Sequence, residues 1–337
     1  MGTIRAFKRD HNCPICDNSK GKCRETENDL ILCMGAVGDR VPGYRYVKPS
    51  KDGVWAIWAP DTDGRGTTSE EWRSRLDQRA RENAARESRR AANCMSAMER
   101  DRHYSRLLDS LNLNLSDRQD LQRRGFTDQQ IEAAGFKSVE QWERLDRHYP
   151  DNLPGVVNEG RSLNTYAPGY LCPTRNQDGL IIGCQVRARE VTPKYYWLTS
   201  ATRANPSGAT PHTTHKELPL TYVKGTGDRP WIAFCEGTGA KPHLASIRLG
   251  CDVVGAAGGQ FGSSPEQIKA AIDSGLAPIL LPDGGAIDNP NVMRQYQGLA
   301  ELVPGLTILW WGQNTKADGD VDEVDPATLD QARRICM

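Results

Sequence analysis

Long apolar runs are absent from this sequence of 337 residues, and their absence excludes whole classes of protein. A membrane-spanning helix needs roughly 18 or more consecutive apolar residues, and no run approaches that length. The first residues, Met-Gly-Thr-Ile-Arg-Ala-Phe-Lys-Arg, also lack the apolar segment of a secretory signal peptide. Mean hydropathy is −0.62. We therefore expect a soluble protein of the cytoplasm with no membrane partner.

The chain also lacks an excess of either charge, since 43 Lys and Arg balance 43 Asp and Glu. Binding of a polyanion through bulk positive charge is therefore not expected. The charges are unevenly distributed, however. Residues 1–229 carry 36 basic and 30 acidic side chains, whereas residues 230–337 carry 7 and 13. A basic first part is thus joined to an acidic last part.

A disulfide scaffold is not indicated, because four of the ten cysteines lie within 21 residues and the others are scattered. The four have the spacing Cys13-x2-Cys16-x6-Cys23-x9-Cys33. Tetrahedral zinc binds four thiolates, and a Cys-x2-Cys turn supplies two of them. The spacing predicts one structural zinc ion. Four unliganded thiols are the alternative, and His11 is interpreted as a bystander.

Residues 1–62 are expected to form a zinc-ribbon module, because so small a β module would otherwise have too little core. Aromatic and β-branched residues alternate between positions 44 and 58 and are interrupted by turn residues at 49–53. This pattern predicts an antiparallel hairpin.

A helical linker is predicted over residues 63–112. It contains the capping box Thr68-Ser69-Glu70-Glu71, and residues 69–111 include no Gly or Pro. Its apolar positions are too sparse for a sustained heptad seam. We therefore predict a spacer made of one long or broken helix, with a coiled coil as the weaker alternative.

Residues 113–228 change from helical to strand-like patterns. Short helices are expected between positions 116 and 145, with Ser116 and Thr127 as N-caps and Gly125 and Gly135 as C-terminal stops. Strand-like runs follow at residues 169–173 and 180–187, joined by the hairpin signal Asp178-Gly179. Residues 199–217, rich in Thr, Ser, Asn and Pro, are predicted to form an irregular loop.

Residues 229–337 alternate between strands and helices. The predicted strands are residues 231–235, 252–255, 278–281 and 307–310, and the predicted helices are residues 241–249, 265–274 and 290–303. Short, fully apolar strands of this kind indicate a parallel sheet covered on both faces. The predicted fold class is therefore multidomain, with α+β and α/β parts.

Carboxylates follow three of these four strands. Glu236 follows the first strand and Asp283 the third, and the fourth is followed by a group of acids, namely Asp318, Asp320, Asp322 and Glu323. Ligands of open α/β sheets bind at this edge. Oxygen ligands without a nearby His favour Mg²⁺ or Mn²⁺. Ordinary loop acids are the alternative. Gly237-Thr238-Gly239-Ala240-Lys241 does not satisfy the phosphate-loop pattern of an ATPase.

These motifs resemble a known domain. Cys235-Glu236-Gly237, Pro282-Asp283-Gly284 and Asp320-Val321-Asp322-Glu323 are similar to the Toprim domain of DnaG-type primases, topoisomerases and related nucleases. Residues 171–187, followed by Pro193-Lys194-Tyr195, resemble the small basic subdomain that precedes Toprim in bacterial primases. The resemblance extends to the primase part of plasmid and mobile-element primase-helicase proteins. It covers residues 10–60 loosely and 165–325 more fully.

The resemblance implies an N-terminal zinc ribbon, a helical linker, a mixed α+β basic subdomain and a Toprim-like sheet over residues 229–337. It implies a DNA primase that makes short RNA primers on single-stranded DNA from NTPs, with Mg²⁺ or Mn²⁺, in replication of a plasmid or mobile element. A replicative helicase is the expected partner, in the same longer chain or separate.

The resemblance also implies roles for particular residues. Glu236 is the expected acid/base or metal-positioning group, and Asp283, Asp320 and Asp322 are the expected metal carboxylates. The residues expected to hold template or NTP phosphates are Arg175, Arg187, Arg189, Lys194 and Lys241. The zinc module is expected to contact template through Lys20, Lys22 and Arg24, with Trp55 or Trp58 stacking on bases.

One departure from the family pattern concerns the second acidic motif. Its usual Asp-x-Asp is Asp283-Gly284-Gly285 here, and Asp288 lies too far along to replace the missing acid. The departure implies weaker catalysis, better in Mn²⁺ than in Mg²⁺. Two alternatives therefore stay open, a Toprim nuclease and a catalytically weak DNA-binding module that recruits a helicase. A topoisomerase is disfavoured because no separate cleavage domain with a tyrosine is evident.

Overall fold

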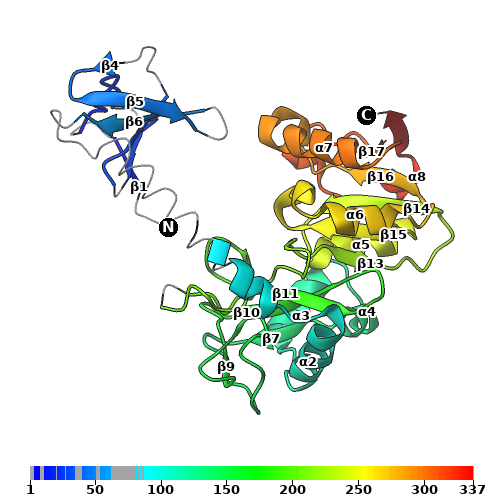
Figure 1. Cartoon of the computed structure of the whole chain (residues 1–337). Helices are drawn as coiled ribbons and strands as arrows, with labels where there is room; N and C mark the ends of the chain where they lie inside the picture. The colour runs from blue at the N-terminus through cyan, green and yellow to red at the C-terminus, as the bar shows by residue number, and fades with distance from the viewer. Residues whose placement is uncertain are drawn as a thin grey trace. The chain divides into compact units, whose positions relative to one another are not determined.

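The computed structural model describes residues 4–7, 11–19, 21–26, 28–34, 40–50, 54–61, 81, 84–85, 87–202 and 204–336 (Figure 1). The chain divides into two compact units, Met1–Ala84 and Ala85–Met337. Within the described residues, no helix has the length and apolar character needed to cross a bilayer.

The smaller unit contains one antiparallel sheet with strand order β1-β2-β3-β6-β5-β4. Its strands are β1 (Ile4–Ala6), β2 (Arg24–Thr26), β3 (Ile31–Cys33), β4 (Arg40–Val41), β5 (Tyr44–Pro49) and β6 (Ala56–Pro60). Strands β5 and β6 pair antiparallel, which confirms the predicted hairpin. The core is small and consists of Phe7, Ile31 and Trp58 with three of the clustered cysteines.

The linker prediction can be compared with the structure only in part, because residues 63–80, including the capping box at Thr68, lie outside the described residues. Residues 81, 84–85 and 87–92 are helical, and helix α2 (Ala97–Asp109) follows after a break. The break arises because Ser96 caps α2 in a capping box with Glu99. Helix α2 does not act as a spacer, since Tyr104 and Leu107 are buried in the core of the larger unit.

Two short helices follow, α3 (Leu115–Arg123) and α4 (Asp128–Ala134). Thr127 caps α4 and Gly135 ends it in the left-handed conformation, as predicted. The cap of α3 is Asn114 and not Ser116, because the Asn114 side chain accepts the Asp117 N–H at 2.9 Å.

A four-stranded antiparallel sheet has the order β12-β11-β10-β7. Its strands are β7 (Lys137–Val139), β10 (Gly169–Arg175), β11 (Ile181–Ala188) and β12 (Tyr195–Trp197), and a separate pair is formed by β8 (Val156–Val157) and β9 (Ser162–Leu163). Strands β10 and β11 form the hairpin predicted at Asp178-Gly179, where Gly179 has a φ of +81°. The described residues of 199–217 contain no helix or strand, as predicted.

A six-stranded sheet has the order β13-β15-β14-β16-β17-β18. Its strands are β13 (Thr221–Val223), β14 (Trp231–Glu236), β15 (Asp252–Ala256), β16 (Ala277–Leu281), β17 (Thr307–Trp310) and β18 (Arg333–Cys336). The four predicted strands are parallel to one another, and β13 and β18 add antiparallel edges that the sequence did not reveal.

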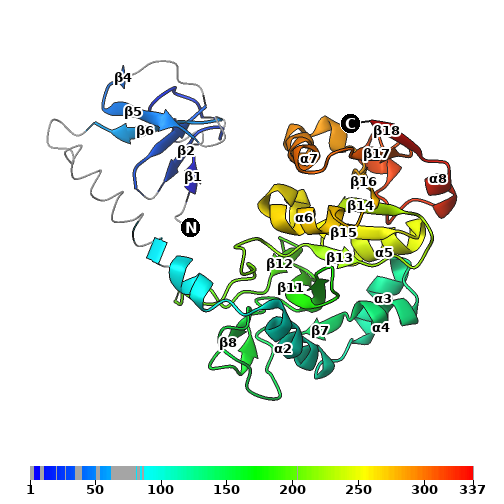
Figure 2. The ribbon, with the colours of Figure 1, turned by 45° about the vertical axis from the view of Figure 1, so that its right-hand side comes forward.

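Helices cover both faces of this sheet (Figure 2). They are α5 (Ala240–Leu249), α6 (Pro265–Ile272), α7 (Pro290–Leu302) and α8 (Pro326–Asp330), with 3₁₀ turns at Ala257–Gly259, Phe261–Ser263, Ala286–Asp288 and Lys316–Asp318. Helices α6 and α7 pack on the face of Ile232 and Phe234, and α5 and α8 on the face of Ala233 and Cys235. The predicted combination of α+β and α/β parts is confirmed.

Candidate functional site

The cysteine cluster (Cys13, Cys16, Cys23 and Cys33) brings four thiols together in the smaller unit. Their Sγ atoms all lie within 4.8 Å of one another. A tight turn places Cys13 and Cys16, since the Asp17 N–H donates to the Cys13 carbonyl at 2.8 Å. Cys33 is the last residue of β3 and Cys23 directly precedes β2. The turn at Cys13 and Cys16 and the paired strands β2 and β3 therefore bring four thiols to distances that suit one tetrahedral metal ion.

The electrostatics of the cysteine cluster fit a divalent cation. Burial and the neighbouring thiols of Cys16 and Cys13 together raise the pKa of the Cys23 thiol to about 11. A zinc ion would relieve this mutual repulsion and hold the four groups as thiolates. His11 is engaged elsewhere, stacked on Phe7 at 5.0 Å and 3.6 Å from a Glu25 oxygen. It stays a bystander.

The acid cluster (Glu236, Asp283 and Asp320) lies at the carboxyl ends of the parallel strands in the larger unit. Glu236 is the last residue of β14, and Asp283 follows the adjacent parallel strand β16. Gly237 turns the chain away after Glu236 with a φ of +95°, and its N–H donates to the Ala256 carbonyl at 2.6 Å. Only glycine adopts this conformation without strain, so the turn fixes where the Glu236 carboxylate sits.

A lysine ammonium joins two of these acids. Lys241, in the first turn of α5, places its Nζ 2.8 Å from Asp283 Oδ1 and 2.8 Å from Asp320 Oδ2. Its side chain is only 15% exposed. The other Asp320 oxygen accepts the Gly284 N–H at 2.8 Å. The sequence assigned Lys241 to phosphate binding, and in the structure its partners are carboxylates.

The three acids of the cluster differ in the direction in which their pKa is shifted. Burial raises the pKa of Glu236, and the charge of Asp283 raises it further. Burial also raises the pKa of Asp283, and the ammonium of Lys241 offsets only part of that effect. Burial opposes ionisation of Asp320 as well, but Lys241 and the Gly284 N–H outweigh it and hold the pKa of Asp320 below its usual range. Glu236 and Asp283 are therefore two crowded carboxylates that a cation would stabilise.

Asp322, the fourth predicted carboxylate, faces another partner. Its Oδ2 lies 2.8 Å from a guanidinium nitrogen of Arg124, which also donates to the Tyr195 hydroxyl at 3.3 Å. Arg124 caps the C-terminus of α3 and is separated from Asp322 by 198 residues. Nothing in the local sequence pattern around Arg124 identifies it, because the pairing depends on how α3 packs against the acidic loop.

The predicted phosphate-binding residues are dispersed. Arg189 makes a bidentate pair with buried Asp117, with nitrogen–oxygen distances of 2.9 and 2.7 Å. Arg187 lies 3.8 Å from Asp120 and over the Tyr170 ring, and Arg175 donates to the Gly179 carbonyl in its own hairpin. Lys194 is exposed. Arg187 of β11 and Arg189, which directly follows β11, therefore attach α3 to the four-stranded sheet.

The two base-stacking candidates of the smaller unit, Trp55 and Trp58, differ in their exposure. Trp58 is 1% exposed and belongs to the core, so it is unable to stack on a base. Trp55 is half-buried and lies under Arg24, whose Cζ is 5.6 Å from the ring centroid. Lys22 is exposed, and Lys20 lies outside the described residues.

Comparison with known proteins finds no matching protein-family model and no matching curated protein. Among solved structures, the chain is similar to a DnaG primase catalytic domain bound to ssDNA, with 16% identity, a TM-score of 0.48, and coverage of 74% of this chain and 81% of that one. It is similar to the RNA polymerase domain of Mycobacterium tuberculosis primase DnaG, with 14% identity, a TM-score of 0.48 and coverage of 73% and 84%. It is also similar to the zinc-binding and RNA polymerase domains of Aquifex aeolicus primase, with 12% identity, a TM-score of 0.48 and coverage of 96% and 78%.

Proposed function

We propose that this chain is a DNA primase that joins NTPs into short RNA primers on a single-stranded DNA template. One observation carries the proposal: Glu236 ends β14 and Asp283 follows the adjacent parallel strand β16, burial raises the pKa of both carboxyls, and the charge of Asp283 raises that of Glu236 further. Two crowded carboxylates at this edge of a sheet are suited to a hard divalent cation. The Toprim-like pattern of the sequence supports the same assignment.

The donor set fits Mg²⁺ or Mn²⁺. Glu236 and Asp283 would hold the ion, with Asp320 beside them. When bound, such an ion activates the attacking hydroxyl and neutralises charge on the phosphates in nucleotidyl transfer. The chain's own contribution is to position these carboxylates. Lys241 does this for Asp283 and Asp320, because its ammonium contacts both.

Two further residues would act around the acid cluster. Lys316 is 73% exposed, and its Nζ lies 3.3 Å from Asp320, so it is placed to meet the phosphates of an incoming NTP. The Arg124–Asp322 ion pair holds the acidic loop against α3, which would position Asp320. We propose that Asp322 supports the site through this contact, in addition to the metal role that the sequence resemblance implies.

Template binding is proposed for the remaining basic residues. Arg175, Arg187 and Lys194 come from one antiparallel sheet or the loop beside it, and phosphate contacts from such a group would hold single-stranded DNA without reading its sequence. In the smaller unit, Trp55 and Arg24 offer a stacking face and a charge. A helicase partner and a plasmid or mobile-element context belong to the same proposal.

A second candidate function is favoured by one contact. The Lys241 ammonium already neutralises Asp283 and Asp320, so the acid cluster has an internal cation where a metal ion would otherwise bind. A site of this kind suits a catalytically weak DNA-binding module that recruits a helicase.

Primer synthesis tests the first function against the second. The full chain is incubated with single-stranded template, labelled NTPs and Mg²⁺ or Mn²⁺. We expect extension products that Asp283→Asn reduces by about 10²- to 10³-fold, because the transition-state charge loses a partner. Asp288→Asn is the matched control, since this exposed acid lies in the same loop and has no place in the cluster.

Each outcome of this assay has a distinct meaning. Shortened template in place of extension products would indicate the nuclease. A shifted but unchanged template would indicate the binding module. Equal loss of activity in Asp283→Asn and Asp288→Asn would contradict a role for the acid cluster.

A further inference from the structure

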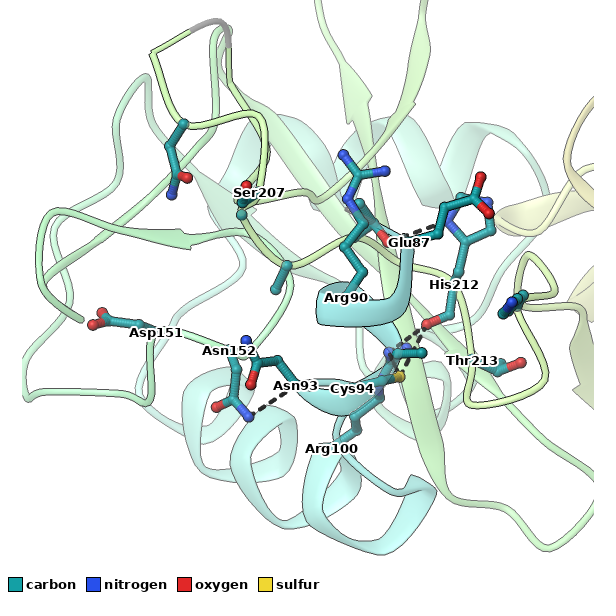
Figure 3. Close-up of a pocket in the computed structure, with 16 residues that line it drawn as sticks. Glu87, Arg90, Asn93, Cys94, Arg100, Asp151, Asn152, Ser207, His212 and Thr213 are labelled. Carbon is teal, nitrogen blue, oxygen red and sulfur yellow. Dashed lines mark hydrogen bonds between the residues drawn. The ribbon is translucent and has the colours of Figure 1, made fainter. Parts of the chain in front are cut away.

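A cavity of about 390 Å³ lies in the larger unit, outside the acid cluster (Figure 3). Its lining comes from three segments that are distant in the sequence, namely residues 87–100, 151–152 and 205–216. None of the residues in the proposed primase site is among them. Its volume is in the range of sites that hold small molecules.

Arg100 is the most unusual residue of this cavity, because it is 2% exposed and still carries a charge. One guanidinium nitrogen donates to the carbonyls of Ile182 and Pro211, at 2.8 and 2.7 Å. The other donates to the His212 carbonyl and to Cys94 Sγ, at 2.5 and 3.0 Å. Its Nε has no partner, and among the described residues no carboxylate forms an ion pair with it. A buried charge that contacts only dipoles lacks a counter-ion, and an anion in the cavity would supply one.

Two other donors of the lining are unpartnered as well. Arg90 donates from one terminal nitrogen to the Pro206 carbonyl at 2.6 Å, but its Nε is buried without a partner. The hydroxyl of Thr213 is also buried without a partner. Buried polar groups normally find hydrogen-bond partners, so three such donors around one cavity point to an acceptor that fills it.

The rest of the lining defines the chemistry of that acceptor. Lys216 adds a third cation at the exposed rim, and burial together with the charges of Arg90 and Arg100 lowers the pKa of His212. The remaining polar groups offer amides and hydroxyls, from Asn93, Asn152, Asn205, Ser207 and Thr210. Glu87 and Asp151 also line the cavity, and both are exposed. The cavity is therefore cationic where it is buried and mixed at its rim.

We propose that this cavity, called here the basic pocket, binds a small phosphorylated ligand of up to about mononucleotide size. Arg100 attracts the phosphate through its charge, since its terminal nitrogens already donate to the chain. Side-chain shifts of Arg90 and Thr213 bring their unpartnered donors to the phosphate, and the amides and exposed carboxylates contact the polar body of the ligand. Ligand binding would tie the helical residues 87–92 and the start of α2 to the loop at 205–216. The proposal is independent of the primase site.

Calorimetric titration of the full chain tests the basic pocket. AMP is the main probe, with pyrophosphate, inorganic phosphate and adenosine in separate arms, in buffer without Mg²⁺ or Mn²⁺ so that nucleotide is not recruited by a metal ion at the acid cluster. We expect one AMP per chain and no binding of adenosine. Arg90→Gln should weaken AMP binding about tenfold or more, because a charge-assisted hydrogen bond is lost.

Further variants keep the test decisive. Arg100→Gln could simply prevent folding, so Thr213→Val serves as the second pocket variant and should weaken binding severalfold. Arg102→Gln is the matched control, since Arg102 is exposed on α2, the helix that carries Arg100, and does not line the pocket. The proposal is overturned if no phosphorylated probe binds, if Arg90→Gln binds AMP as well as Arg102→Gln does, or if only a single-stranded oligonucleotide binds.

Discussion

The cysteine cluster and the acid cluster are both candidate metal sites, and they are built in opposite ways. The cysteine cluster takes four identical ligands from 21 residues of sequence, and among the described residues no cation competes for them. The acid cluster takes its members from one strand end and two loops, up to 84 residues apart, and Lys241 contacts two of them. The first arrangement suits an ion that holds a fold together. The second suits an ion that binds and dissociates together with substrate.

This contrast follows from core size. The smaller unit buries only a few large side chains, so a bound metal would supply much of its folding free energy. The larger unit has continuous apolar cores on both faces of its six-stranded sheet. Its fold does not depend on a metal at the acid cluster, because Lys241 already compensates Asp283 and Asp320.

The largest expected effect is therefore loss of zinc from the cysteine cluster. Cys16→Ser combined with Cys33→Ser should lower the zinc content from about one ion per chain to near zero and unfold the smaller unit. Metal analysis gives the stoichiometry, and amide NMR signals report the fold. Cys336→Ser is the control, because this cysteine is exposed and remote in sequence. Unchanged zinc content in the double variant would contradict the assignment.

Lys241→Met should produce the next largest effect. Removing the ammonium leaves Asp283 and Asp320 without their shared partner in a buried setting, and breaking a buried ion pair costs about 3–5 kcal/mol. We expect lower stability in urea unfolding and, in the folded variant, tighter Mn²⁺ binding by calorimetry, since the carboxylates lose a competing cation. Weaker Mn²⁺ binding would show that Lys241 assists the metal. Addition of Mn²⁺ should restore part of the lost stability.

The pH dependence of Mn²⁺ binding tests the electrostatics of the acid cluster. The pKa values of Glu236 and Asp283 are raised, so these groups keep their protons above the usual carboxylate range near 4. Without metal, the folded state binds more protons than the unfolded state in that range, so these two groups favour folding at low pH and lose that contribution as pH rises through their folded pKa values. Mn²⁺ affinity should accordingly increase with pH from about 4.5 upward, as calorimetry at several pH values would measure. A flat profile above pH 4.5 would contradict the raised pKa values.

Sequence patterns predicted the parts of the molecule that depend on local chemistry. The four parallel strands are short apolar runs, the Cys spacing is compact, and the Thr127 cap and Gly135 stop are local signals. Strand β13 was missed because three residues after an irregular loop are too few to show a period. The Asn114 cap was missed because Ser116 offers the same chemistry two residues later.

Long-range charge pairing limited the prediction of the site itself. Strand order brought Glu236 and Asp283 to one edge, which the pattern of the strands implied. The positions of Lys241 and Arg124 depended on packing between elements, and no local period indicates which acid a buried cation will contact. Arg189 looked like a phosphate ligand because its type is common in such sites, yet its position beside Asp117 makes it a structural ion pair.

Lys316→Gln should have the smallest effect and provides the sharpest comparison with Lys241. Both lysines contact Asp320, but the Lys316 side chain is 73% exposed and its Nζ lies 3.3 Å from the carboxylate, whereas that of Lys241 is 15% exposed and lies at 2.8 Å. Exposed ion pairs contribute about 0.5 kcal/mol or less, because water screens the charges. Urea unfolding of Lys316→Gln should therefore match that of the unchanged protein. If Lys316 meets NTP phosphates as proposed, the same variant should raise the KM for NTP with little change in kcat, whereas a stability loss comparable to that of Lys241→Met would show that the exposed lysine, too, holds the acid cluster together.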